Sequence, residues 1–161
     1  MAQATTFDEI YRRLAPEIFR YALGLTRQRA VAEDITAETF ARALTTHDPT
    51  RLPTVRAFLF TIAHRLVMDH FRRHKTEPLP DPDLVGGAAE FDRVSEQRDF
   101  LDFALRFLAN LPEPEREALL LRAAELSYAE IAATLRITEA NAKVRVHRAR
   151  LKLALWRAEQ L

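Results

Sequence analysis

The chain has 161 residues, of which 48% are hydrophobic and 29% charged, with a net charge of +1, and this is the composition of an ordinary globular protein. It contains no apolar run of about 18 residues that could span a membrane, and its N-terminus lacks the pattern of a signal peptide, so we expect a soluble, cytoplasmic protein. The absence of cysteine excludes disulfides, thiolate nucleophiles and zinc–thiolate sites.

The first 75 residues predict three helices. Apolar residues at helical spacing predict a helix over residues 6–25, which Pro16 should break or restart. A second helix is predicted over residues 31–44, and a third, basic at its end, over residues 55–75. The prolines of residues 46–54 predict a loop between the second and third helices.

The chain divides near residues 76–95, where three prolines precede the only Gly-Gly and the composition is typical of a linker. Further helices are predicted over residues 93–110 and after "LPEPERE", where Pro114 suits a first turn. No segment has the pattern of a strand. We predict an all-α fold of two small helical domains, residues 1–76 and 96–161, joined by a flexible linker, residues 77–95.

Charge is segregated along the chain. Residues 1–75 carry 12 Lys/Arg and 8 Asp/Glu, residues 76–100 carry 2 and 7, and residues 101–161 carry 10 and 8. Two basic blocks around an acidic segment indicate two modules with a common polyanionic target. Two solvated surfaces joined by an acidic tether would produce the same pattern.

Two helices near the C-terminus are predicted to form a helix-turn-helix. Ser127 precedes "YAEIAATL", and Glu130 follows three residues later, which is the arrangement of a capping box. Thr138 can cap the next helix in the same way. The connection, residues 136–138, has the length of a helix-turn-helix turn.

The second of these helices has an apolar stripe at intervals of four, three and four, formed by Ala142, Val146, Ala149 and Leu153. Residues 139–157 also contain six Lys/Arg and one acid. A basic solvent face is the plain alternative, but capping, turn length and charge together favour a helix that enters the DNA major groove. The residues predicted to face DNA are Asn141, Lys143, Val144, Arg145, His147 and Arg148.

Five segments in this order resemble a bacterial sigma factor: "AEDITAETFARAL", "VRAFLFTIAHRLVMDHFRRHK", "LPEPEREALLLR", "LSYAEIAATLRIT" and "AKVRVHRARLKL". The resemblance covers nearly the whole chain and is closest to the small extracytoplasmic-function, or group IV, class. It implies an N-terminal domain that binds core RNA polymerase and opens the −10 element of promoter DNA. It also implies a C-terminal helix-turn-helix that reads the −35 element, a linker that runs near the RNA exit path, and an anti-sigma factor as a further partner.

The resemblance also assigns residues. Those implied to bind polymerase are Glu33, Asp34, Glu38, Phe40 and Arg42. Those implied to bind the −10 element are Arg56, Phe58, His64, Arg65, Asp69, Arg72, Arg73 and Lys75. The family often has tryptophan at Phe58 and asparagine at Arg65, so the preferred −10 base is left open. In the C-terminal reader the family often has glycine at Arg136, which weakens the prediction of the −35 sequence.

Two other classes of function fit parts of the sequence. A helix-turn-helix regulator that acts without polymerase would leave the first 75 residues without a role. An enzyme could use His70 and His74, which have the spacing of a metal pair, but Arg72 and Arg73 would repel a cation. With no Ser/His/Asp set and no glycine-rich phosphate loop, we expect no catalytic residue, metal or cofactor.

Overall fold

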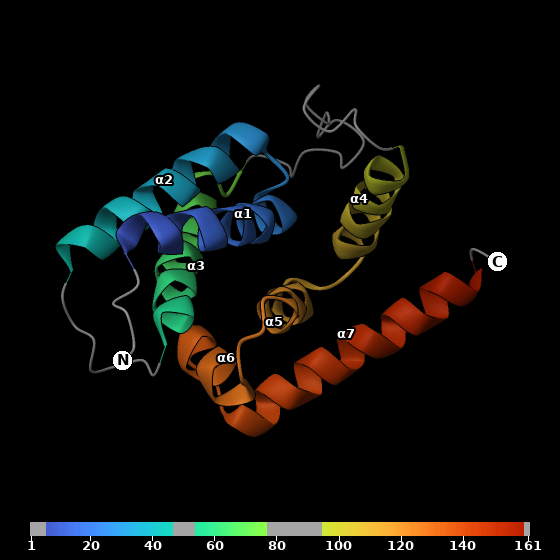
Figure 1. Ribbon diagram of the computed structural model, residues 1–161. Helices are drawn as coiled ribbons and strands as arrows, with labels where there is room; N and C mark the ends of the chain where they lie inside the picture. The colour runs from blue at the N-terminus through green and yellow to red at the C-terminus, as the bar shows by residue number, and fades with distance from the viewer. Residues whose placement is uncertain (1–5, 47–53, 77–94, 160–161) are drawn as a thin grey trace.

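The computed structural model describes residues 6–46, 54–76 and 95–159, and this part of the chain forms seven helices and no strand, as the all-α prediction requires. The predicted linker, apart from its last residue, and residues 47–53 of the predicted loop lie outside the described residues. The helices in chain order (Figure 1) are α1 (Phe7–Thr26), α2 (Arg29–Thr45), α3 (Val55–Arg73), α4 (Ser95–Ala109), α5 (Glu113–Ala123), α6 (Tyr128–Leu135) and α7 (Glu139–Glu159).

The prediction that Pro16 breaks or restarts the first helix is wrong, because α1 continues through this residue. Leu14 and Ile18, on either side of the proline, are both buried in the same core. Burying two large aliphatic side chains stabilises a fold by about 3–6 kcal/mol, which offsets the roughly 3 kcal/mol that an internal proline costs. Pro16 itself is exposed, so water can bond to the carbonyl that the missing N–H leaves without a helical partner.

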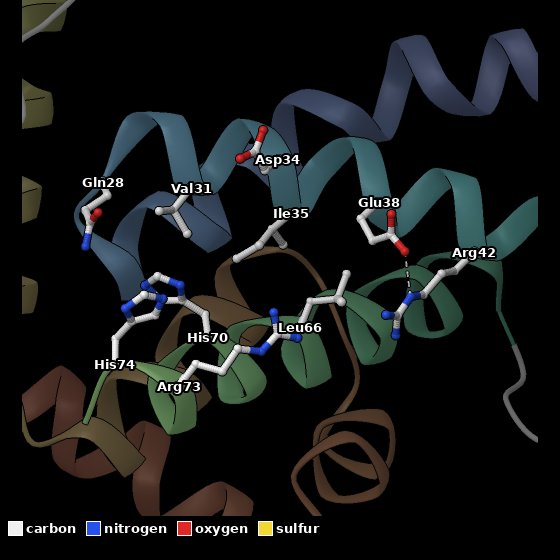
Figure 2. Close-up of a pocket in the computed structure, with 10 residues that line it drawn as sticks. All are labelled: Gln28, Val31, Asp34, Ile35, Glu38, Arg42, Leu66, His70, Arg73 and His74. Atoms are coloured by element: carbon white, nitrogen blue, oxygen red, sulfur yellow. Dashed lines mark hydrogen bonds and ion pairs between the residues drawn. The ribbon is translucent and has the colours of Figure 1, made fainter. Parts of the chain in front are cut away.

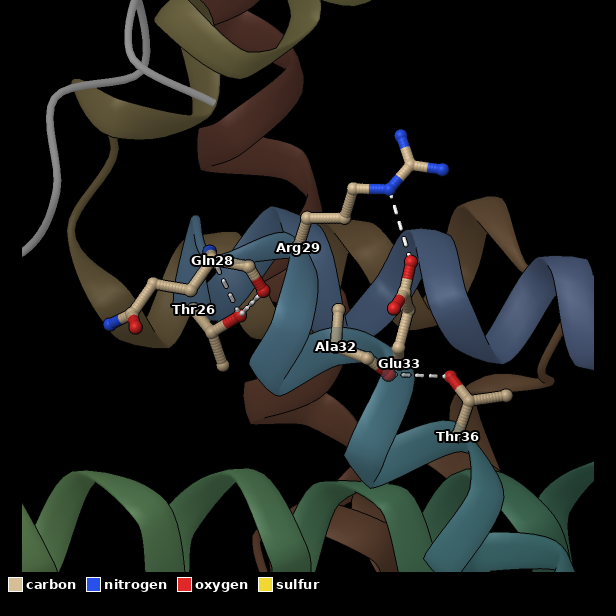
Figure 3. Close-up of polar contacts among 6 residues, drawn as sticks. All are labelled: Thr26, Gln28, Arg29, Ala32, Glu33 and Thr36. Carbon is tan, nitrogen blue, oxygen red and sulfur yellow. Dashed lines mark hydrogen bonds and ion pairs between the residues drawn. The ribbon is translucent and has the colours of Figure 1, made fainter. Parts of the chain in front are cut away.

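The turn between α1 and α2 is held by local polar contacts (Figure 3). The Thr26 hydroxyl, which is fully buried, donates to the Ala22 carbonyl at 2.8 Å and accepts a longer bond from the Gln28 N–H at 3.4 Å. On the exposed side of α2, Arg29 pairs with Glu33 at 3.0 Å. The tight turn makes α2 lie along α1 and leaves its acidic face in solvent (Figure 1).

The predicted caps of the helix-turn-helix are confirmed. The Ser127 hydroxyl accepts from the Glu130 N–H at 3.1 Å, and the Glu130 carboxylate accepts from the Ser127 N–H at 2.9 Å. The Thr138 hydroxyl accepts from the Asn141 N–H at 3.1 Å at the start of α7. Three members of the predicted inward stripe of α7 have no exposed surface, namely Ala142, Val146 and Ala149.

One buried cation joins α4 to α5. The Arg116 side chain donates from Nε to the Leu108 carbonyl at 2.7 Å and from Nη2 to the Leu111 carbonyl at 2.8 Å. Leu108 lies in the last turn of α4 and Leu111 lies just beyond its end, where carbonyls lack the donors that a continuing helix would supply. Arg116 thus closes the corner on which α7 packs, and the second apolar cluster, which includes Leu108 and Ala149, forms beside it.

The two halves of the chain share one apolar core. A single cluster contains Ile18 and Phe60 from the first half together with Leu121 and Ile131 from the second. In Figure 1, α6 (orange) lies beside the beginning of α3 (green), and α5 lies next to α1. Among the helices that the structure describes, none has the length and apolarity needed to cross a membrane.

Candidate nucleic-acid interface

The first half of α7 presents most of the predicted DNA-facing side chains to solvent. Asn141, Lys143, Val144, His147 and Arg148 are exposed, and Arg145 is half-buried. Because the buried stripe lies on the opposite side of the helix, these side chains are free to approach a groove without disturbing the packing of α7. The structure therefore brings together five of the six predicted residues on one accessible face.

Arg145 has a second environment. It lies near the buried carboxyl of Glu117 in α5, whose pKa is raised to about 7, first by burial and then by the neighbouring Glu113, while Arg145 and Arg116 lower it. The Arg145 guanidinium thus compensates part of a charge in the protein interior. Arg145 therefore has a structural role in addition to the contact with DNA that the sequence predicts.

A contact that sequence reasoning missed lies beside Lys143. The Tyr128 ring, at the start of α6, has the Arg122 guanidinium 4.5 Å from its centroid and the Lys143 ammonium 5.8 Å from it. The Arg122 side chain also donates to the Leu126 carbonyl at 2.9 Å. Cations over an aromatic face lose part of their conformational freedom, so the ring holds two positive charges next to the exposed face of α7. No local pattern signals this contact, because its residues come from three helices.

The second half of α3 is open and basic, whereas its first half is covered. Arg65, Arg72, Arg73 and Lys75 are exposed, and Arg72 pairs with the half-buried Asp69 one turn away. Phe58 is half-buried against the common core. The eight residues implied for the −10 element therefore do not form one exposed surface here.

Arg56, at the start of α3, is fully engaged inside the protein. Its Nη1 lies 2.5 Å from a carboxylate oxygen of Glu17 in α1 and 3.0 Å from the carbonyl of Ala124, between α5 and α6. Its side chain is 18% exposed. In this arrangement Arg56 contacts both halves of the chain and offers little to a ligand.

His64 is held by a hydrogen bond between its Nδ1 and the hydroxyl of the buried Tyr21, at 3.0 Å. Burial, and then the charge of Arg65, lowers the pKa of His64 to about 4. The imidazole is therefore neutral near pH 7 and adds no positive charge to the surface of α3.

The acidic face of α2 carries four of the five residues implied for polymerase. Glu33, Asp34, Glu38 and Arg42 are exposed, and Arg42 bonds Glu38 at 2.9 Å. Phe40 is different: it is 3% exposed, and its ring meets that of Tyr11 edge-on at 4.8 Å. Phe40 thus supports α2 from the inside and contributes little to the exposed face.

A groove of about 550 Å³ runs between α2 and α3 (Figure 2). Asp34 and Glu38 lie on its α2 side, and Arg73, His70 and His74 lie on its α3 side. The rings of His70 and His74 are 4.5 Å apart between centroids. Among the described residues, no group of three or more His, Asp or Glu side chains is placed to hold a metal ion. The groove has acidic and basic walls and an apolar floor.

Two family models match this chain, Sigma-70 region 2 over residues 10–77 and Sigma-70, region 4 over residues 104–153. The chain is 32% identical over 154 residues to the ECF RNA polymerase sigma factor SigM of Bacillus subtilis, covering 92% of this chain and 93% of that protein. It is 33% identical over 153 residues to the ECF RNA polymerase sigma factor SigL of Mycobacterium tuberculosis, covering 91% and 85%.

Solved structures show the same fold. The sigma factor RpoE of Bartonella quintana, in complex with the anti-sigma factor NepR, superposes with a TM-score of 0.71 at 24% identity, covering 91% of this chain and 93% of that one. CnrH, in complex with the cytosolic domain of CnrY, gives a TM-score of 0.70 at 23% identity, covering 96% and 89%.

Proposed function

The chain belongs to the extracytoplasmic-function class of RNA polymerase sigma factors, and from this premise we propose which of its surfaces perform each step of promoter recognition. A sigma factor directs promoter recognition and transcription initiation and is not an enzyme. Accordingly, we assign this chain core RNA polymerase and promoter DNA as partners and no catalytic residue. The cytoplasm, where both partners reside, is its proposed place of action.

In our proposal α7 reads the −35 element. The observation that carries it is the exposed, basic first half of a capped helix, with Lys143 and Arg148 on the side away from the buried stripe. The Tyr128 ring joins this surface and is proposed to hold Lys143 where its ammonium can reach the phosphate backbone. Residues 96–161 form the proposed domain that contains α7 and reads the −35 element.

Residues 1–76 form the domain proposed to bind polymerase and the −10 element, with residues 77–95 as the connection. The exposed acidic face of α2 and the groove beside α3 are proposed to receive a polymerase helix. The basic second half of α3, together with Arg56, Phe58 and His64 from its first half, is proposed to hold the opened −10 strand. An anti-sigma factor is proposed as the partner that keeps the chain inactive, and this is supported by the likeness to RpoE, which was solved with one.

The role of α7 is tested with Arg148→Ala, assayed by transcription from a cognate promoter with core polymerase. Loss of a side chain that contacts a base should reduce −35-dependent initiation by about 10–100-fold without weakening the polymerase complex. Arg157→Ala removes the same charge from an exposed position near the end of α7 and is the matched control. Unchanged promoter selectivity in the Arg148 variant would refute the assignment.

The role of α2 is tested with Asp34→Lys, which reverses a charge on the exposed face of that helix. We expect at least a tenfold weaker complex with core polymerase in a pull-down or by fluorescence anisotropy, with an unchanged circular dichroism spectrum. Asp8→Lys, exposed on α1, is the control and should bind polymerase normally. Equal binding by both variants would place the polymerase contact elsewhere.

A further inference from the structure

One buried carboxyl group, that of Glu117 in α5, lies near the helix proposed to read the −35 element. Glu117 is 8% exposed. The two helices pack on each other there, since Leu121 of α5 shares an apolar cluster with Ala142 and Val146 of α7. An ionised carboxylate is costly in such surroundings unless a proton or a cation compensates its charge.

The first source of compensation is a proton shared with Glu113, one helical turn earlier in α5. The two carboxyl groups are hydrogen-bonded to each other. Because carboxylates only accept hydrogen bonds, this contact requires a proton on one of the two groups. Glu113 is exposed and Glu117 is buried, so the proton is favoured on Glu117. Burial, and then Glu113, raises the pKa of Glu117 to about 7.

The second source of compensation is Arg145 of α7, whose positive charge lowers the pKa of Glu117. Arg145 is half-buried and lies beside the buried stripe, whereas Lys143 and Arg148 of the same helix are exposed. A long arginine side chain at such a border can turn toward the interior or toward solvent. The Arg145 guanidinium therefore has two alternatives, the Glu117 carboxylate and the DNA that α7 is proposed to contact.

The other charged and titratable groups around Glu117 are committed or cationic. Arg116 also lowers the pKa of Glu117, but its guanidinium bonds two carbonyls at the end of α4. The pKa of Arg116 is itself lowered by burial and then by the charge of Arg27. The pKa of Tyr21 in α1 is raised by burial and then by Glu117. When Glu117 is protonated, these cations remain, so the attraction that draws Arg145 inward is lost.

The position of α7 does not depend on this pair of residues. Lys152 donates to the Glu115 carboxylate of α5 at 2.7 Å, and three residues of the buried stripe have no exposed surface. A change of charge on Glu117 therefore moves the side chain of Arg145 and leaves the helix in place.

We propose that Glu117 is a positioning residue for DNA recognition: when ionised it draws Arg145 inward, and when protonated beside Glu113 it releases Arg145 to a phosphate of the −35 element. The inference rests on the proposed role of α7 in reading that element. The sign follows from the pKa of about 7, because most Glu117 carboxyls carry the proton at pH 6 and few do at pH 8. Promoter binding should therefore strengthen as the pH falls over this range.

The test compares the full-length wild type with Glu117→Gln, each in complex with core polymerase, on duplex promoter DNA by fluorescence anisotropy. Glutamine has the shape of the protonated carboxyl and can still donate a hydrogen bond to Glu113. We expect the variant to bind about threefold more tightly than the wild type at pH 8 and equally at pH 6. His147 and the polymerase are the same in both complexes, so their own titration cancels in the ratio. A ratio that is equal at both pH values would overturn the proposal.

Two further variants show whether Glu117 acts through Arg145. In an Arg145→Ala background, adding Glu117→Gln should change promoter affinity by the same factor at both pH values. Glu139→Gln removes an exposed carboxylate at the start of α7 and is the matched control, which should likewise give a ratio independent of pH. A pH-dependent gain that persists without Arg145, or that Glu139→Gln reproduces, would refute the positioning role.

The shared proton is tested with Glu113→Gln, which leaves Glu117 in place. Removing the neighbouring charge lowers the pKa of Glu117, so the midpoint of the pH profile of promoter binding should fall by about half a pH unit or more. A circular dichroism spectrum and retained binding to core polymerase show that the variant folds. An unmoved midpoint would refute the shared proton and with it the proposal.

A promoter with a replaced −35 sequence separates this inference from the proposed function. If the wild-type complex loses no affinity for that promoter, the proposed role of α7 is wrong and the inference falls with it. If the wild type loses affinity but the Glu117→Gln ratio does not change with pH, the inference alone is wrong and α7 remains the proposed reader.

Discussion

Arg136 lies in the turn between α6 and α7 with a left-handed backbone, at φ 57° and ψ 48°. This conformation costs a residue with a Cβ roughly 1–2 kcal/mol relative to glycine, which adopts it freely. Arg136 ends α6 because its N–H bonds the Ala132 carbonyl, and its side chain is exposed. The strain is thus local, and glycine would relieve it without removing a buried contact.

We therefore predict that Arg136→Gly raises the free energy of unfolding by about 1 kcal/mol. Thermal and urea denaturation of the purified full-length variants measure the effect. Ala133→Gly, in the middle of α6, is the control and should lower stability by a similar amount, because glycine there only weakens the helix. A destabilised Arg136→Gly variant would show that the side chain makes a stabilising contact.

His64 predicts a pH dependence of stability. Its pKa is lowered to about 4 in the folded state, against about 6.5 in an unfolded chain, so between these values the unfolded chain binds the additional proton. Stability from this residue is complete above pH 6.5 and is lost as the pH falls toward 4. At pH 5 the loss should be about 2 kcal/mol relative to pH 7.5.

The measurement is denaturation of the wild type and of His64→Gln from pH 7.5 to pH 5. Glutamine does not titrate and can still hydrogen-bond the Tyr21 hydroxyl, so the variant should show a smaller decrease over this range. Parallel curves for the two proteins would mean that His64 is protonated in the folded state.

At the scale of the helices, capping residues determined where a helix starts, whereas an internal proline did not determine where a helix breaks. The capping boxes at Thr6 and Ser127 start α1 and α6, and the predicted helices agree with the structure to within a few residues. Pro16 failed as a break because the residues on either side of it are buried in one core. A cap acts through bonds that its own helix supplies, whereas the effect of a proline depends on what the rest of the protein packs against that helix.

The corner between α4 and α5 depends on Arg116. We predict that Arg116→Lys lowers the free energy of unfolding by about 2 kcal/mol, because one ammonium cannot reach the Leu108 and Leu111 carbonyls in the geometry of the guanidinium. Urea denaturation measures the loss. Arg157→Lys makes the same change at an exposed position and should leave stability unchanged. Equal stability of the two variants would show that water replaces the Arg116 bonds.

At the scale of the whole molecule, the proposed function requires two weak promoter contacts, one with the −10 element and one with the −35 element, to form together. Tethering raises the effective concentration of the second contact once the first has formed, and polymerase supplies the frame on which both meet the promoter. In the proposed function, the exposed cations of α7 and of the second half of α3 contact phosphates, and such binding falls steeply with salt.

We predict that the free chain binds duplex promoter DNA at least 100-fold more weakly than its complex with core polymerase does. We also predict that Lys143→Ala lowers the salt dependence of the complex by about one unit in the slope of log K against log salt. Fluorescence anisotropy at several salt concentrations measures both quantities. Tight binding by the free chain would favour a regulator that acts without polymerase.

The sequence by itself determined the helix class, the caps of the helix-turn-helix, the buried stripe of α7 and the family. These features depend on bonds and spacings within about four residues, or on the order of segments along the chain. Only the tertiary structure decided that Phe40 and Arg56 face inward, that His64 is neutral, that Tyr128 joins Lys143, and that α6 packs on α3. Each of these depends on which helix lies opposite, because a side chain's burial and charge are set by partners that can be more than 70 residues away in the chain.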